Sequence, residues 1–220
     1  MGQVIDVLRD NLPAFAAGLW VTFRLVAISL VIAIAVGTLV AALRVAPVKW
    51  LQRVGAIYVE TFRNVPLLVL LFIAFAGLRR AGVPVSAWVA GTASLGLYTG
   101  AYVAEVLRSG VFTVGRGQIE ASLSLGFTYP ATLRRIVLPQ AFRTVIPPLG
   151  SLVIAMIKNS AIIGASLLAL PDLLKEARIT QSRTFETDAT FLWAAVGYLL
   201  LTGAATITVR YLERRLAIRR

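Results

Sequence analysis

The 220-residue sequence contains no cysteine and no histidine. It therefore forms no disulfide, offers no thiolate nucleophile and lacks the usual ligands of structural zinc. Acid–base catalysis by imidazole is excluded as well. An intramembrane enzyme would then need paired carboxylates or a serine–lysine pair. Lys158 and Ser160 are the only close pair of the second kind, and residues two positions apart do not face each other on a helix.

Acidic residues are scarce, and a phosphate-binding loop is missing. Ten Asp and Glu residues stand against 22 Lys and Arg residues, so the net charge is +12. The basic residues stand at the ends of apolar runs, which is typical of membrane proteins rather than of nucleic-acid-binding proteins. No stretch has the form G-x-x-x-x-G-K-[ST], so ATP hydrolysis must take place on another polypeptide. We predict no enzymatic activity, no bound cofactor or metal, and no nucleic-acid partner.

Long apolar runs dominate the sequence. Apolar residues make up 58% of it and the mean hydropathy is +0.82, far above the values of soluble domains. A helix of about 20 apolar residues crosses the hydrocarbon core of a bilayer. We therefore predict an all-α, polytopic membrane protein in which residues 1–220 form a single transmembrane domain. Its five predicted transmembrane helices are residues 20–43, 59–78, 87–106, 149–168 and 190–209.

Prolines and polar residues predict where the spans bend and begin, and which segments lie outside them. Residues 1–16 are expected to form a short amphipathic lead-in before the first span. Pro66 should bend the second span, and Pro147 with Pro148 should open the fourth. The polar segment 171–188 is expected to be partly helical and to lie outside the cell.

Two pairs of opposite charges are spaced to contact each other on a helix. Glu60 and Arg63 are three residues apart, as are Glu105 and Arg108, so each pair is expected to interact. The third span also carries Gly96-x-x-x-Gly100, a face of small residues that favours close helix contact. That contact is expected either with a second chain or within this one.

The distribution of basic residues predicts the orientation. Five spans put the termini on opposite sides, and basic residues concentrate on the cytoplasmic side. With the C-terminus inside and the N-terminus outside, the inner side carries Arg44, Lys49, Arg53, Arg108, Arg116, Arg134, Arg135, Arg143, Arg210, Arg214, Arg215, Arg219 and Arg220. The outer side then carries only Arg9, Arg79, Arg80, Lys175, Arg178 and Arg183.

A charged, amphipathic segment, residues 117–141, lies between the third and fourth spans. Ile119, Leu123 and Phe127 recur at i, i+4 and i+8, which predicts a short helix. Gly126 permits a sharp turn after it. Held against the membrane on both sides, this segment is expected to be a surface for another protein, although periodicity alone is also compatible with a solvated linker helix.

The amino-acid sequence of this segment resembles the EAA loop of the membrane subunits of bacterial ABC importers, and its flanks are similar to those of the polar amino-acid permeases. The match follows the pattern EAA, three residues, G, nine residues, I, one residue, LP. The third position of the EAA motif is Ser122 instead of alanine. This small residue is expected to leave the packing nearly intact. The predicted ATPase-coupling residues are Ile119, Glu120, Ala121, Ser122, Leu123, Gly126, Phe127, Leu138 and Pro139.

This resemblance implies a type I-like permease of the bacterial plasma membrane with a cytoplasmic coupling helix. The implied partners are two ATPase subunits that bind ATP and magnesium, a second permease chain that is identical or different, an extracytoplasmic amino-acid-binding protein, and membrane lipids. The implied function is import of polar amino acids.

Lys158, with Asn159 and Ser160, interrupts the fourth apolar run. A lysine inside a span costs about 2.5–3.5 kcal/mol on insertion scales, so it must face water, a partner or a ligand. We predict that these three residues line a central cavity near a helix break and that Lys158 holds the substrate carboxylate. Snorkelling of Lys158 to the outer interface is the alternative. In similar permeases an acidic residue often stands where this chain has Asn159, so its replacement favours glutamate, aspartate or a neutral polar amino acid over a cationic one.

An ion-coupled secondary carrier is the competing function. Such carriers usually have inverted repeats with unwound half-helices in both halves. The sequence contains no second copy of the Lys158 region, which favours the importer permease.

Overall fold

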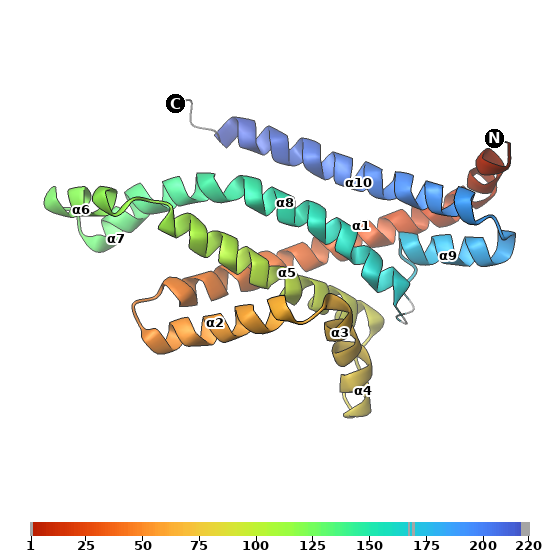
Figure 1. The fold of residues 1–220 in the computed structure, drawn as a ribbon, viewed down its shortest axis with the longest axis horizontal. Helices are drawn as coiled ribbons and strands as arrows, with labels where there is room; N and C mark the ends of the chain where they lie inside the picture. The colour runs from red at the N-terminus through yellow and green to blue at the C-terminus, as the bar shows by residue number, and fades with distance from the viewer. Residues whose placement is uncertain (1, 167, 169, 217–220) are drawn as a thin grey trace.

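The computed structural model describes residues 2–166, 168 and 170–216 of the chain. These residues form helices and their connections, with no strand among them, so the all-α prediction is confirmed. Figure 1 shows the helices as an elongated bundle with α5 running through its middle. Leu167, Arg219 and Arg220, which the sequence assigns to the fourth span and to the inner side, lie outside the described residues.

The first helix is longer than predicted. α1 runs without interruption over Gly2–Val45 and contains Pro13. The prediction of a separate lead-in over residues 1–16 is therefore wrong. The reason is tertiary: Phe15 is buried in an apolar cluster with residues of α9 and α10, and this packing stabilises the helix beyond the length that a bilayer requires.

The second predicted span is broken. α2 (Lys49–Asn64) ends at Val65, which is extended, and α3 (Leu67–Phe72), the π-helical turn η1 (Ile73–Gly77) and α4 (Leu78–Arg80) continue at 102° to it. The change of direction expected at Pro66 is therefore confirmed, but it is a break between two helices and not a bend within one. Pro66 lacks the N–H that the helix needs, and its ring forces the preceding residue out of the helical region. The proline ends the helix instead of bending it.

α5 (Ala87–Phe112) is the central helix, and its glycines pack against α1. A β-carbon at residue 96 would overlap the side chain of Ile32, and one at residue 100 would lie 3.2 Å from the hydroxyl of Tyr58 and 3.4 Å from the carbonyl oxygen of Ala33. Gly96 and Gly100 therefore serve a contact within this chain. Many residues of α5 are buried by the surrounding helices, so small and polar side chains such as Thr92, Ser94 and Thr99 are tolerated in it.

The segment after α5 leads into one long helix. α6 (Arg116–Ser124) is followed by α7 (Tyr129–Thr132), the π-helical turn η2 (Leu133–Val137) and α8 (Leu138–Ala165). The helix begins before residue 149, so the expectation that Pro147 and Pro148 open it is wrong. Both Pro147 and Pro148 lie inside α8. Buried contacts of Ala141 and Val145 continue the helix on the N-terminal side of the prolines.

Two helices complete the chain. α9 (Leu173–Thr184) makes the predicted polar segment mainly helical, and α10 (Thr187–Leu216) contains the predicted span 190–209. Asp172 caps α9, because its Oδ1 accepts a hydrogen bond from the backbone N–H of Lys175 at 2.9 Å.

Within the described chain, three helical stretches are long and apolar enough to cross a membrane: Val4–Val45, Tyr129–Ala165 and Thr187–Arg215. The bent pair Lys49–Asn64 with Leu67–Arg80 would make a fourth. At one end of the bundle lie α6, α7 and the connection between α1 and α2; α9 and the start of α1 lie at the other (Figure 1).

Candidate functional site

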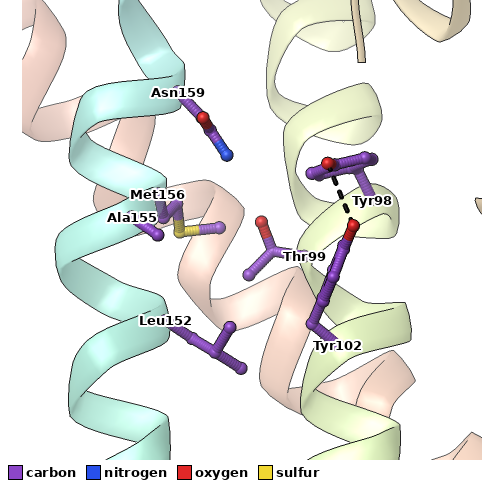
Figure 2. A pocket seen from close by; sticks show the side chains of 7 residues that line it. All are labelled: Tyr98, Thr99, Tyr102, Leu152, Ala155, Met156 and Asn159. Atoms are coloured by element: carbon purple, nitrogen blue, oxygen red, sulfur yellow. Dashed lines mark hydrogen bonds between the residues drawn. The ribbon is translucent and has the colours of Figure 1, made fainter. Parts of the chain in front are cut away.

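A cavity of about 230 Å³ lies between α5 and α8. Figure 2 shows its two walls, one from each helix. The residues that line it are Tyr98, Thr99, Tyr102, Leu152, Ala155, Met156 and Asn159. On α8 these residues stand at i, i+3, i+4 and i+7, which is one face of a helix.

Of the three predicted substrate residues, the structure brings only Asn159 to this cavity. Lys158 is exposed on a neighbouring face of α8. Ser160 is fully buried, and its hydroxyl donates a hydrogen bond to the carbonyl of Ile157 at 2.6 Å. The expected helix break is absent, since α8 is continuous to Ala165. Successive residues of an unbroken helix point about 100° apart, so the three side chains diverge.

Three residues of α5 supply the polar atoms of the opposite wall. The hydroxyls of Tyr98 and Tyr102 are 3.2 Å apart, and their ring centroids are separated by 5.2 Å (Figure 2). Thr99 lies beside them. The sequence interpretation missed all three; the available signal was their spacing at i, i+1 and i+4, which puts three hydroxyls on one side of an apolar helix.

The electrostatic character of the cavity is neutral to positive. No carboxylate is among its described lining residues. The guanidinium Cζ of Arg63 lies 5.2 Å from the centroid of the Tyr102 ring, a cation–π contact at the cavity wall. Arg63 therefore stands beside a wall of hydroxyls and one amide. Such a site can hold a small polar molecule that carries a carboxylate.

α6 is joined to α7 through Ser122. Its buried hydroxyl shares a hydrogen bond of 2.5 Å with that of Thr132, so the serine in the third EAA position makes a contact that alanine cannot. Between the helices Gly126 has a φ of 81° and open space around its Cα. The glycine is needed there for its left-handed backbone conformation.

The predicted coupling residues divide into two groups. Ile119 is half-buried and packs on a cluster formed by Val114, Val137 and Ala141, which holds α6 to the bundle. Phe127 is also half-buried but follows the end of α6, so it does not continue the expected stripe. The exposed members of the predicted set are Glu120, Ala121, Leu123, Gly126, Leu138 and Pro139.

Exposed apolar side chains gather around these residues. Leu125 is 79% exposed, and Tyr129, Leu123 and Leu138 are exposed as well. Patches of exposed apolar side chains are common where proteins bind partners. We call Leu123, Leu125 and Tyr129 the α6 surface.

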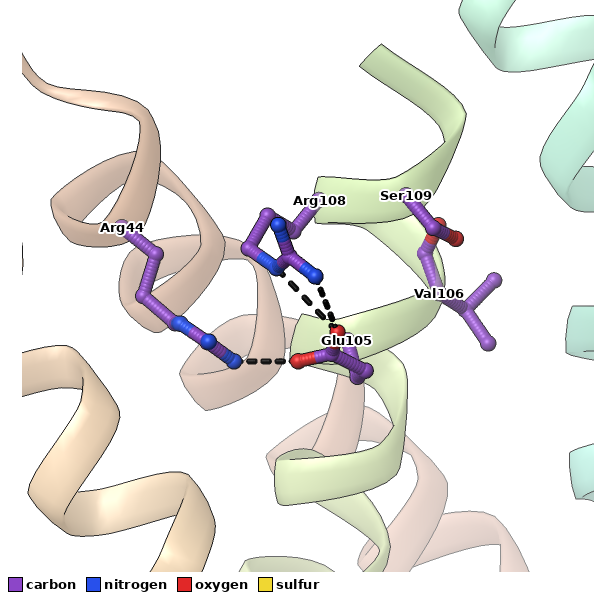
Figure 3. A network of polar contacts seen from close by, with 5 residues as sticks. All are labelled: Arg44, Glu105, Val106, Arg108 and Ser109. Atoms are coloured by element: carbon purple, nitrogen blue, oxygen red, sulfur yellow. Dashed lines mark hydrogen bonds and ion pairs between the residues drawn. The ribbon is translucent and has the colours of Figure 1, made fainter. Parts of the chain in front are cut away.

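An ion cluster joins α1 to α5 near the same end of the bundle (Figure 3). Glu105 accepts hydrogen bonds from Arg108 Nη2 at 2.5 Å and Nε at 3.1 Å, which confirms the predicted pair. Its other oxygen accepts a hydrogen bond from Arg44, a contact that sequence spacing did not indicate. The other predicted pair is wrong: in the described part of the chain Glu60 and Arg63 form no ion pair, since Arg63 stacks on Tyr102 instead.

Comparison with known proteins gives consistent results. Residues 33–218 match the family model of the binding-protein-dependent transport system inner membrane component. The chain is 39% identical to the probable glutamine ABC transporter permease GlnM of Bacillus subtilis, covering 96% of this chain and 97% of the relative. It is 40% identical to the glutamate transport system permease GluC of Corynebacterium glutamicum, covering 98% and 97%.

Solved structures show the same fold. A chain from the crystal structure of an amino acid ABC transporter with histidines is 33% identical and has a TM-score of 0.89, covering 94% of this chain and 96% of that one. A chain of the inward-facing methionine ABC transporter MetNI is 20% identical with a TM-score of 0.72, covering 95% and 99%, and supports the fold alone.

Proposed function

This chain belongs to the family of binding-protein-dependent transport system inner membrane components, as a polar amino-acid ABC permease, and from that premise we propose how it works. It is a multi-pass inner membrane protein without enzymatic activity of its own. Permeases of this family work with ATPase subunits and a substrate-binding protein. We propose that two ATPase subunits hydrolyse ATP and that the chain imports acidic amino acids, glutamate first among them.

We propose five membrane crossings: α1, the bent α2–α4 pair, α5, α8 and α10. Length and apolar composition support α1, α8 and α10, and allow the bent pair as a fourth. α5 is the fifth because it is enclosed by the others. With the N-terminus outside, the basic end of the bundle, which includes Arg44, Lys49 and Arg116, lies in the cytoplasm.

The observation that carries the substrate proposal is the composition of the α5–α8 cavity. Hydroxyls of Tyr98, Thr99 and Tyr102 and the amide of Asn159 line it, and the guanidinium of Arg63 lies on the ring of Tyr102. An amino acid with a second carboxylate gains from the charge of Arg63 and meets no anion on the described walls. A cationic amino acid would be repelled.

Among the described residues, those that line this cavity all belong to α5 and α8, so a second permease chain is needed to enclose a substrate. We propose that two chains form the translocation path and that ATPase subunits contact the α6 surface in each. Closure of the ATPases on ATP moves α6, and α7 and η2 transmit the motion to α8, which carries Asn159. The mechanism requires only that the ATPases and the binding protein bind the two conformations differently.

Uptake by the reconstituted complex tests this function. Proteoliposomes containing the permease and its ATPase subunits, with the binding protein outside and ATP inside, should accumulate labelled glutamate, and arginine should not compete. Uptake that needs an ion gradient and no ATP would establish a secondary carrier instead. Uptake of glutamine with exclusion of glutamate would correct the substrate while preserving the ABC mechanism.

A further inference from the structure

A second pocket, of about 490 Å³, lies where α1, α2 and α5 meet at the α6 end of the bundle. It is separate from the α5–α8 cavity. On α2, Lys49, Gln52 and Arg53 stand at i, i+3 and i+4 and face it, while the other helices contribute Arg44, Arg108 and Phe112. We call it the basic pocket.

The basic pocket has an excess of positive charge. Arg44 and Arg108 are half-buried and both bind Glu105, which orients them and neutralises one charge. Lys49 and Arg53 are exposed, and neither forms an ion pair within the described residues. Four cations against one carboxylate leave a site that favours an anion, and the planar guanidinium groups suit phosphate oxygens.

A neighbouring face of α2 is apolar and uncovered. Trp50, Val54 and Ile57 are 64%, 49% and 65% exposed and stand at i, i+4 and i+7. Tryptophan at the end of such a stripe is typical of the boundary between headgroups and acyl chains. A ligand that occupies both faces of α2 needs a phosphate and, attached to it, long apolar chains.

We propose that the basic pocket binds the phosphate of an anionic phospholipid headgroup, with its acyl chains lying along Trp50, Val54 and Ile57. The position of the pocket at the cytoplasmic boundary rests on the proposed function, because the orientation of the chain is part of that proposal. Charge complementarity selects an anionic lipid over a zwitterionic one, and the adjoining apolar stripe selects a lipid over a free phosphate ion.

Quenching of Trp50 fluorescence tests the proposal on the full-length chain. The protein is reconstituted in phosphatidylcholine vesicles that contain either brominated phosphatidylglycerol or brominated phosphatidylcholine at the same mole fraction. We expect stronger quenching by the brominated phosphatidylglycerol. Comparison with Trp50→Phe isolates the signal of this residue from that of the other tryptophans.

The double variant Lys49→Gln/Arg53→Gln should lose this preference. Each basic residue near a membrane surface contributes to binding of anionic lipid, so removal of two should lower the preference for phosphatidylglycerol about tenfold or more. Arg79→Gln/Arg80→Gln is the matched control, because it removes two exposed charges from α4, outside the pocket, and should leave the preference unchanged.

Three results would overturn the proposal. One is equal quenching by the two brominated lipids in the native chain. Another is relief of quenching by added inorganic phosphate, which would identify a site for free anions. A third is loss of ATPase binding in Lys49→Gln/Arg53→Gln with an unchanged lipid preference, which would identify a protein contact.

The orientation can be tested separately. Quenching in symmetric vesicles does not depend on which way the chain faces, so a wrong orientation leaves it intact. Because the sequence has no cysteine, Val48→Cys, exposed at the start of α2 and outside the basic pocket, offers a single thiol for an impermeant maleimide. Labelling of that thiol from the outside of intact cells would refute the proposed orientation. It would not contradict the proposal that the basic pocket binds an anionic lipid.

Discussion

The carboxylate of Asp172 lies directly against the backbone of Gly164, at the passage from α8 to α9. A β-carbon on residue 164 would overlap Oδ1, Cγ and Oδ2 of the aspartate. Oδ1 caps α9, whereas Oδ2 is buried without a hydrogen-bond partner among the described residues. The glycine therefore provides the space in which the cap of one helix rests on the end of another.

Substitution Gly164→Ala should destabilise the protein. The added methyl group has no room unless Asp172 moves, and overpacking of this kind costs about 1–3 kcal/mol. The thermal midpoint of the purified, detergent-solubilised protein measures the effect. Gly203→Ala is the control, because nothing lies within 4 Å of a β-carbon at that position of α10. Equal midpoints for the two variants would contradict the packing argument.

Asp172 should make stability depend on pH. Burial raises the pKa of its carboxyl from 3.8 to about 6; the N–H of Lys175 opposes that rise, and the charge of Glu176 adds to it. A raised pKa in the folded state means that the native protein binds the proton more tightly than the unfolded chain does. The associated stability is complete below pH ~4 and is lost as the pH rises to about 6, with a magnitude of roughly 3 kcal/mol.

The isosteric variant Asp172→Asn separates this effect from packing. Asparagine keeps an oxygen for the N–H of Lys175 but carries no charge, so the thermal midpoint should become independent of pH between about 4 and 6. At pH 8 the variant should be at least as stable as the native chain. A midpoint that still falls across this interval would assign the pH dependence to another group.

Gly126→Ala should impair coupling. The left-handed backbone at residue 126 is unfavourable for alanine, so the turn between α6 and α7 should be distorted and the α6 surface displaced. We expect loss of ATPase binding or of ATP-driven uptake, measured by co-purification and by transport. Gly117→Ala, on the exposed side of α6 with open space around it, should preserve both. Undiminished uptake in Gly126→Ala would refute the role of this turn.

Glu105→Gln should loosen the junction of α1 and α5. It leaves the half-buried Arg44 and Arg108 without their shared carboxylate, at a cost on the order of 1–3 kcal/mol, between the values for exposed and buried ion pairs. Glu60→Gln makes the same charge change at an exposed site and should have little effect on the thermal midpoint. If both variants melt alike, the ion cluster does not stabilise this junction.

Sequence reasoning identified the class of protein because its evidence is local. Apolar runs, the placement of basic residues and the EAA spacing can all be read from consecutive residues. The helix boundaries were harder to predict from the sequence. A change of direction at Pro66 was expected, but its angle of 102° could not be read from the local sequence. The continuity of α8 through Pro147 and Pro148 depends on contacts of Val145 that no local pattern shows.

The candidate cavity could be predicted only in part, for a similar reason. Lys158 and Asn159 were grouped because they are neighbours in the sequence, whereas an unbroken helix turns them toward different surroundings. Tyr98 and Tyr102 line the cavity because α5 packs against α8, a tertiary relationship. The buried carboxylate of Asp172 likewise depends on its contact with Gly164.

The identity of residue 159 should decide which charge the transporter accepts. Asn159→Asp places a carboxylate in a cavity whose described walls have none. At a separation of about 5 Å and an effective dielectric constant near 20, two unit charges interact by roughly 3 kcal/mol, so the KM for glutamate should rise at least tenfold and arginine should begin to compete.

Labelled uptake in proteoliposomes with varied competitors measures both changes. Ser151→Asp adds the same charge to α8 outside the cavity and should leave the ratio of glutamate to arginine transport unchanged. An unaltered ratio in Asn159→Asp as well would mean that the binding protein, and not this cavity, selects the substrate.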